Sequence, residues 1–251
     1  MGQTAIFKNA WKMCGSLYNA ALAECVYRFR THIVSRTCGG SVITSRFSEV
    51  VTTESQLEEV LGVPSDRVLR KQIAILDANS RAFIAKSPFL LIASHDTDGN
   101  VDVSPKGDPA GFVRVLDETT LVIPERPGNR RADTFRNVLA NPGVGILFLI
   151  PGKTETLRVS GSAMIVRDRW LRDEMAIGEK VPELGLVVNV REAFFHCSKC
   201  MLRSHLWESE HWPDITDLPS LARAMVDAGK LSESVDQMQA LIELDARERL
   251  Y

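Results

Sequence analysis

The chain has 251 residues, of which 45% are hydrophobic and 25% are charged, and its formal net charge at pH 7 is −2. This composition is typical of a folded protein with a sizeable core, and the near-zero net charge disfavours nucleic acid or an anionic membrane as a partner. No apolar run approaches the roughly 18 residues of a membrane-spanning helix. Any anion-binding site must therefore be local.

Residues 1–46 differ in composition from the rest, with six basic residues and a single acid, Glu24. A basic, acid-poor segment of this kind resembles an organellar transit segment, and an unstructured arm or translated sequence upstream of the true start are the alternatives. The five cysteines form no dense framework, which favours a reducing compartment. We expect the cytoplasm, or the mitochondrial matrix if the arm is a transit segment.

Two helices are expected before the first strand. Thr53 and Gln56 match a capping box, and Gly62 can end that helix in the left-handed conformation. Ser65 or Asp66 can cap a second helix. The apolar residues of this second helix recur at helical spacing. The helix is expected to end at Ser87, because the residue before a proline disfavours the helical conformation. The apolar residues are Leu69, Ile73, Leu76 and Phe83.

Short apolar runs then predict strands, separated by a turn at 98–100 and by a short helix over 133–139. Many short strands with few helices favour a mainly β (α+β) barrel over a doubly wound parallel sheet. After residue 213 helical spacing returns, and Asp217 is the expected cap of the first of these helices. The predicted strands cover 89–93, 112–116, 119–123, 144–150, 154–166 and 186–195.

Three segments rich in glycine, proline and basic residues carry the functional argument, and we interpret them as loops at one rim of the barrel. They span 104–108, 126–131 and 157–161. Arg158 and Ser160 point the same way along their strand, about 7 Å apart. Guanidinium groups beside the N–H groups of a helix start are a good receptor for a phosphate. We therefore expect Lys106, Arg130 and Arg158 to share one cavity.

Several motifs in this order resemble the FMN-binding split-barrel superfamily related to pyridoxamine 5′-phosphate oxidase, in particular an uncharacterised subgroup of its flavoproteins. The resemblance covers about residues 50–210. The chain lacks two segments typical of true pyridoxamine-phosphate oxidases, so vitamin B6 oxidation is not the expected activity. The motifs are Asp102-Val-Ser-Pro-Lys-Gly-Asp108, Gly111-Phe112, Pro124-Glu-Arg-Pro-Gly-Asn-Arg130, Asn141-Pro142, Thr156-Leu-Arg-Val-Ser-Gly161, His196-Cys197 and Arg203-Ser-His-Leu-Trp207.

The resemblance implies a six-stranded split barrel with an N-terminal helix and C-terminal helices, forming a homodimer that binds FMN at the subunit interface. It implies an FMN-dependent oxidoreductase acting on an unknown small molecule; the alternatives are a non-catalytic flavin or haem carrier and a deazaflavin in place of FMN. The implied domains are a basic arm over 1–46, the FMN-binding barrel over 47–213 and a helical extension over 214–251. The cofactor-binding residues carried over are Ser104, Lys106, Arg126, Asn129, Arg130, Arg158, Ser160, Arg203, Ser204 and Trp207.

Cys197 and Cys200, with His196 and His205 nearby in sequence, also suggest a zinc or redox site. A closed zinc site usually draws ligand pairs from two separate places, and a thioredoxin-type motif needs a strand-helix-strand setting. Neither condition is met. We therefore expect the start of a structural helix here and no metal site.

Overall fold

The computed structural model describes residues 46–251, which divide into two compact units after Val63. The described part of the first unit contains helix α2 (Glu54–Leu61), and the predicted capping box is confirmed. Thr53 Oγ1 accepts a hydrogen bond from the Gln56 N–H at 3.2 Å, and Gln56 Oε1 accepts one from the Thr53 N–H at 3.3 Å. Gly62 ends the helix with a φ of 73° but a ψ of 174°, outside the left-handed helical region. The predicted arm lies outside the described residues, except for Arg46.

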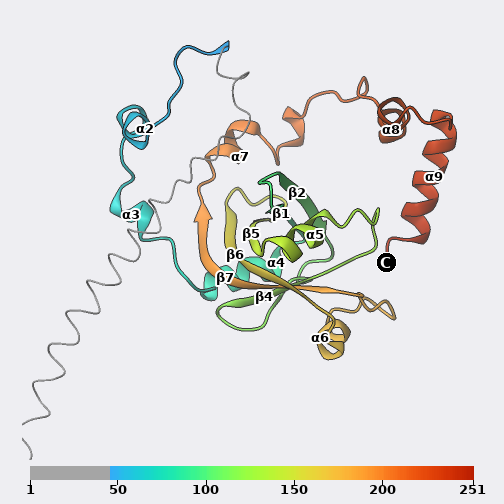
Figure 1. Cartoon of the computed structure of the whole chain (residues 1–251), viewed down its shortest axis with the longest axis horizontal. Helices are drawn as coiled ribbons and strands as arrows, with labels where there is room; N and C mark the ends of the chain where they lie inside the picture. Colours follow the sequence, from blue (N-terminus) through green and yellow to red (C-terminus); the bar gives the residue numbers. More distant parts are fainter. Residues whose placement is uncertain (1–45) are drawn as a thin grey trace, which may run out of the picture. The chain divides into compact units, whose positions relative to one another are not determined.

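The second unit is built on one antiparallel sheet of seven strands in the order β2-β1-β5-β6-β7-β4-β3 (Figure 1). The α+β split-barrel class is confirmed. The sheet has seven strands rather than the expected six, and the strand missing from the predicted set is β2. Long β6 and β7 pair along almost their whole length and form the centre of the sheet. The strands are β1 (Phe89–His95), β2 (Val101–Gly107), β3 (Arg114–Val115), β4 (Thr120–Pro124), β5 (Gly143–Leu149), β6 (Thr156–Val166) and β7 (Gly185–His196).

Alternation along the strands creates the core. Every second residue of β1 and β5 is buried, as expected for strands with one face inward. The same alternation places one side of β6 inside and leaves Arg158 outside. The fully buried side chains include Leu90, Ile92, Leu121, Ile146, Phe148, Leu157, Val159 and Val188.

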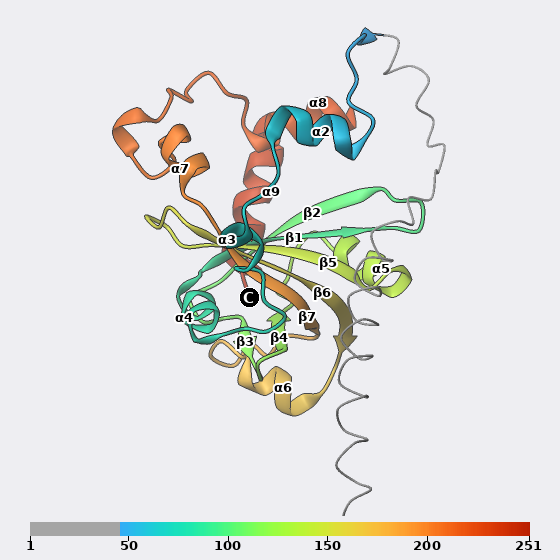
Figure 2. The same cartoon turned by 90° about the vertical axis from the view of Figure 1, so that its left-hand side faces the viewer.

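Most helices of this unit are short, and two of them, α4 and α5, pack against the sheet. Helix α5 packs against β1, β2 and β6 at one side of the barrel (Figure 2). Helices α8 and α9 pack against each other after the last strand. Among the described residues, no helix is both long and apolar enough to cross a membrane. The helices are α3 (Asp66–Leu69), α4 (Ala78–Lys86), α5 (Asp133–Ala140), α6 (Arg169–Glu174), α7 (Lys199–Ser204), the 3₁₀ helix η2 (Ser209–His211), α8 (Leu221–Gly229) and α9 (Val235–Glu248).

The prediction of one long second helix is wrong. The chain leaves the helix at Arg70, and Ile73 instead forms a β-bridge with Ala193. Asp77 then caps a separate helix, α4, because its carboxylate accepts a hydrogen bond from the Ser80 N–H at 2.8 Å.

Two further sequence predictions need correction. Residues 104–107 belong to strand β2 rather than to a loop, and Pro105 is tolerated there because β2 is an edge strand. Residues 157–161 lie within β6, which confirms the predicted strand over 154–166. The first C-terminal helix is capped by Ser220, whose hydroxyl accepts from the Arg223 N–H at 3.2 Å, and not by Asp217.

Candidate functional site

A cavity of about 940 Å³ opens where β2, the turn after β4 and the start of α5 meet. The loop at 179–183, between β6 and β7, closes another side of it, and Tyr251 reaches it from the C-terminal end of the chain. The predicted site residues that line this cavity are Ser104, Lys106, Arg126, Asn129 and Arg130.

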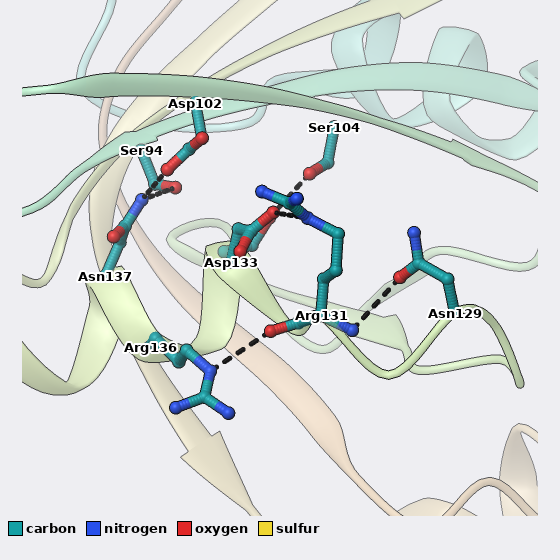
Figure 3. A network of polar contacts seen from close by, with 9 residues as sticks. Ser94, Asp102, Ser104, Asn129, Arg131, Asp133, Arg136 and Asn137 are labelled. Carbon is teal, nitrogen blue, oxygen red and sulfur yellow. Dashed lines mark hydrogen bonds and ion pairs between the residues drawn. The ribbon is translucent and has the colours of Figure 1, made fainter. Parts of the chain in front are cut away.

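The turn that leads from β4 into α5 has an unusual backbone. Arg130 has a φ of 63° and Ala132 a φ of 55°, both in the left-handed region that non-glycine residues rarely adopt. Local hydrogen bonds hold the turn: Asn129 Oδ1 accepts from the Arg131 N–H at 3.0 Å, and Arg136 Nε donates to the Arg131 carbonyl at 3.1 Å (Figure 3). Such conformations persist where surrounding contacts impose them, and they concentrate at binding sites.

Helix α5 points its N-terminus into the cavity. Ala132 occupies the cap position and offers no side-chain acceptor, so the first N–H groups of the helix are not capped from there. The helix is fixed in place by the buried Asn137 amide, which donates to Ser94 Oγ at 3.1 Å and to Asp102 Oδ2 at 2.8 Å (Figure 3). The resulting arrangement is favourable for an anion.

Acidic side chains pair with two of the predicted cations that line the cavity. Arg126 Nε lies 2.6 Å from Asp108 Oδ2, and the Asp108 side chain is only 1% exposed. Lys106 Nζ lies 2.8 Å from Glu125 Oε2.

Arg131 is paired too, with its Nε 2.8 Å from Asp133 Oδ2, and this partner raises the pKa of the guanidinium (Figure 3). Of the basic residues at the cavity, Arg130 and Lys180 have no ion-pair partner among the described residues. They are the cations that remain available to a ligand.

Several cavity residues were missed by the sequence reasoning. Thr134 Oγ1 donates to Ser104 Oγ at 3.0 Å and so places two hydroxyl groups together. Tyr251 donates from its hydroxyl to Asp108 Oδ1 at 2.9 Å, and its ring lies 5.8 Å from the Arg126 guanidinium carbon. The hydrogen bond to Asp108 raises the pKa of Tyr251. Of these two residues, only Thr134 could have been found from the sequence, because it lies at the start of the predicted helix.

The prediction that Lys106, Arg130 and Arg158 share one cavity is wrong, because Arg158 does not line it. Arg158 lies on the outer face of β6, with its guanidinium carbon 5.4 Å from the centre of the Phe194 ring. Lys71 Nζ lies at the same distance from that ring, and the His196 ring is 4.9 Å from it. Burial first, then the charges of Arg158 and Lys71, lower the pKa of His196. This second basic group consists of Lys71, Arg158 and His196 around Phe194.

The other predicted site residues are also outside the cavity. Ser160 is 7% exposed within the sheet. Arg203 and Ser204 lie on exposed helix α7, and the Trp207 indole donates to the Lys153 carbonyl at 2.8 Å. The structure therefore brings five of the ten predicted residues together at the cavity, whereas the other five do not line it.

The barrel and its rim cavity define an α+β split-barrel protein with a single-chain cleft suited to an anionic ligand. Residues 76–197 match the family model for pyridoxamine 5′-phosphate oxidase, and this segment of the chain is similar to that family.

Solved structures with a similar arrangement include HupZ of Group A Streptococcus, with 20% identity over 47% of this chain and 92% of that one and a TM-score of 0.38. General stress protein 26 of Bacillus anthracis has 14% identity over 46% and 88% of the two chains and a TM-score of 0.37. The heme storage protein HutZ of Vibrio cholerae has 18% identity over 48% and 93%, with a TM-score of 0.36. Similarity at this level says nothing about a ligand. The comparison with curated proteins finds no significant match.

Proposed function

We propose that the chain binds FMN and acts as an FMN-dependent oxidoreductase on a small molecule. The observation that carries the proposal is Arg130, held in a left-handed conformation beside the open N-terminus of α5 with no ion-pair partner among the described residues. Backbone N–H groups and a guanidinium together complement a phosphate dianion.

The other cavity residues fit the same ligand. Ser104 and Thr134 present neighbouring hydroxyl groups, and Lys106 lies on the same strand as Ser104. Its ion pair with Glu125 keeps Lys106 ordered and lets it share its donors with an added anion. A volume near 940 Å³ is at the upper end of the range usual for small-molecule and cofactor sites.

A second copy of the chain would supply the remaining predicted contacts. Arg158, Arg203 and Trp207 do not line the cavity of their own chain. In the proposed homodimer, the outer face of β6 of one copy lies against the cavity of the other and completes two equivalent sites. Bound FMN would supply a ring that accepts a hydride or electrons, while the protein supplies position and charge.

The phosphate assignment is tested with the double variant Lys106→Gln/Arg130→Gln. Each charge-assisted hydrogen bond contributes about 1.5–3 kcal/mol, so we expect FMN affinity to fall by at least about tenfold. Riboflavin, which lacks the phosphate, should bind the wild type and the variant equally. Flavin fluorescence titration gives both dissociation constants. The control is Arg169→Gln, an exposed arginine on α6 that is paired with Asp173.

An unchanged ratio of FMN to riboflavin affinity in the double variant would contradict the phosphate site. The visible spectrum of the purified protein separates the cofactor classes, because flavin, deazaflavin and haem absorb differently. Bleaching of bound flavin by NADH or NADPH would support the oxidoreductase, whereas a flavin that no donor or substrate reduces would support the carrier.

A further inference from the structure

The segment that follows α7 gathers three potential metal ligands. One nitrogen each of His205 and His211 and one carboxylate oxygen of Glu208 all lie within 4.8 Å of one another. Within residues 46–251, this is the only such group of three histidine, cysteine or acidic side chains. It lies apart from the cavity described above, which none of the three residues lines.

Local backbone structure explains the convergence. The Glu208 N–H donates to the His205 carbonyl at 3.0 Å, and the His211 N–H donates to the Glu208 carbonyl at 2.9 Å. Two successive turns with this three-residue spacing, joined at Glu208 in an extended conformation, bring the three side chains together. His205, in the left-handed conformation with a φ of 50°, turns the chain out of α7 and begins the stack.

The distances suit a small divalent ion. His205 Nδ1 and His211 Nδ1 lie 3.0 and 3.4 Å from Glu208 Oε2. In a tetrahedral zinc site with bonds near 2.0–2.1 Å, neighbouring ligand atoms are about 3.3 Å apart. The two imidazole rings are stacked with centroids 4.3 Å apart and planes 21° from parallel, so both present Nδ1 to the same carboxylate.

We propose that His205, Glu208 and His211 form a site for a divalent first-row transition metal, with Zn²⁺ as the expected ion. Two imidazoles and one carboxylate are ligands that zinc accepts, and an open fourth position is filled by water. About half of each histidine side chain is exposed, so the ion can enter and water can complete the shell. The ordinary alternative is an exposed ion pair, which contributes little to stability.

A metal here would order the chain beyond α7. Trp207 lies between the ligands in sequence and is anchored to the Lys153 carbonyl, and the Trp212 indole donates to the Leu206 carbonyl at 3.1 Å. An ion held by His205 and His211 ties both ends of this segment together. Amide hydrogen exchange within residues 205–212 should therefore slow when zinc is added to the full chain.

The test measures Zn²⁺ binding to the metal-stripped full chain by competition with a chromophoric chelator. Zinc can also bind to the cysteines, which are Cys14, Cys25, Cys38, Cys197 and Cys200. The readout is therefore the number of tightly bound zinc ions per chain that a variant loses relative to the wild type. We expect His205→Ala and His211→Ala each to lose one equivalent. Glu208→Gln should bind that zinc ion at least about tenfold more weakly, because replacing even a residue that only hydrogen-bonds to a metal ligand lowers metal affinity by about that factor.

Two controls are matched to the site. Glu210→Gln removes the same charge from a neighbouring position outside the cluster and should change nothing. Cys197→Ser/Cys200→Ser removes two exposed thiols and should leave this equivalent and the slowed exchange intact.

Retention of every zinc equivalent in His211→Ala, or unchanged affinity in Glu208→Gln, would overturn the three-ligand site. So would loss of the slowed exchange in the cysteine variant. Cobalt substitution gives an independent check, because a thiolate-to-cobalt charge-transfer band that vanishes in Cys197→Ser/Cys200→Ser together with the slowed exchange would place the metal on the cysteines. None of these readouts depends on FMN binding.

Discussion

His196 lies at the end of β7 beside two cations and an aromatic ring. Burial disfavours its charged form, and the positive charges of Arg158 and Lys71 disfavour it further, so its pKa in the folded chain is below the ordinary 6.5. The unfolded chain therefore takes up a proton first as the pH falls. The stability that this residue contributes is fully present above pH 6.5 and is lost as the pH falls through its folded pKa.

An NMR titration of the His196 ring protons checks this environment. We expect a pKa below 6.5 in the wild type and a higher value in Arg158→Gln, where one of the two repelling charges is removed. Arg223→Gln, on helix α8, removes an equal charge from an exposed pair and should leave the titration unchanged. A wild-type pKa at or above 6.5 would contradict the assignment of burial and charge as causes.

Gly161 of β6 packs directly against the backbone of β7 at Asn189. The register of the pair shifts between Ser160 and Gly161, which marks a β-bulge. A Cβ atom added to Gly161 would overlap the Asn189 carbonyl oxygen and would lie 2.9 Å from its carbon, so the backbone must move.

Gly161→Ala should therefore destabilise the chain by about 1–3 kcal/mol, the usual cost of overpacking a well-packed interior. Gly145→Ala is the matched control, because Gly145 lies opposite Ser160 on neighbouring β5 and an added Cβ meets nothing within 4 Å. Urea unfolding gives both free energies. Equal losses in the two variants would show that the approach of β6 to β7 is not the constraint.

Elements whose signals are local were predictable. All strands but β2 follow from local apolar patterns, and the Thr53 capping box follows from two residues three apart. The break between α3 and α4 was not predictable, because Ile73 forms a bridge with Ala193, which lies far along the chain. The ion pairs of Lys106 and Arg126 are also non-local, so the sequence showed the cations of the cavity but not the acids that neutralise them.

At the scale of the molecule, the two halves of the predicted cofactor site lie apart within a single chain. Lys106 and Arg130 line the cavity, whereas Arg158 lies on the outer face of β6. If a homodimer brings these surfaces together, each FMN takes its phosphate contacts from one copy and Arg158 from the other. The arrangement makes a prediction about dimers that carry a different defect in each copy.

Consider a dimer in which one copy is Lys106→Gln/Arg130→Gln and the other is Arg158→Gln. With sites shared between copies, one site combines both defects and the other combines an intact cavity with an intact Arg158. We therefore expect the mixed dimer, purified through a different tag on each copy, to bind one FMN at a concentration where neither parent dimer binds any. Two wild-type copies carrying the same tags should bind two.

If each site is instead formed within a single copy, the number of FMN molecules bound per mixed dimer differs, because each site then contains the defect of its own copy. The mixed dimer would bind no FMN under the same conditions, and Arg158 would have to act from within its own chain. A chain that stays monomeric at all concentrations, measured by light scattering with and without FMN, would exclude shared sites altogether. The flavin count and the molar mass therefore decide together whether the outer face of β6 completes the cavity of a second copy.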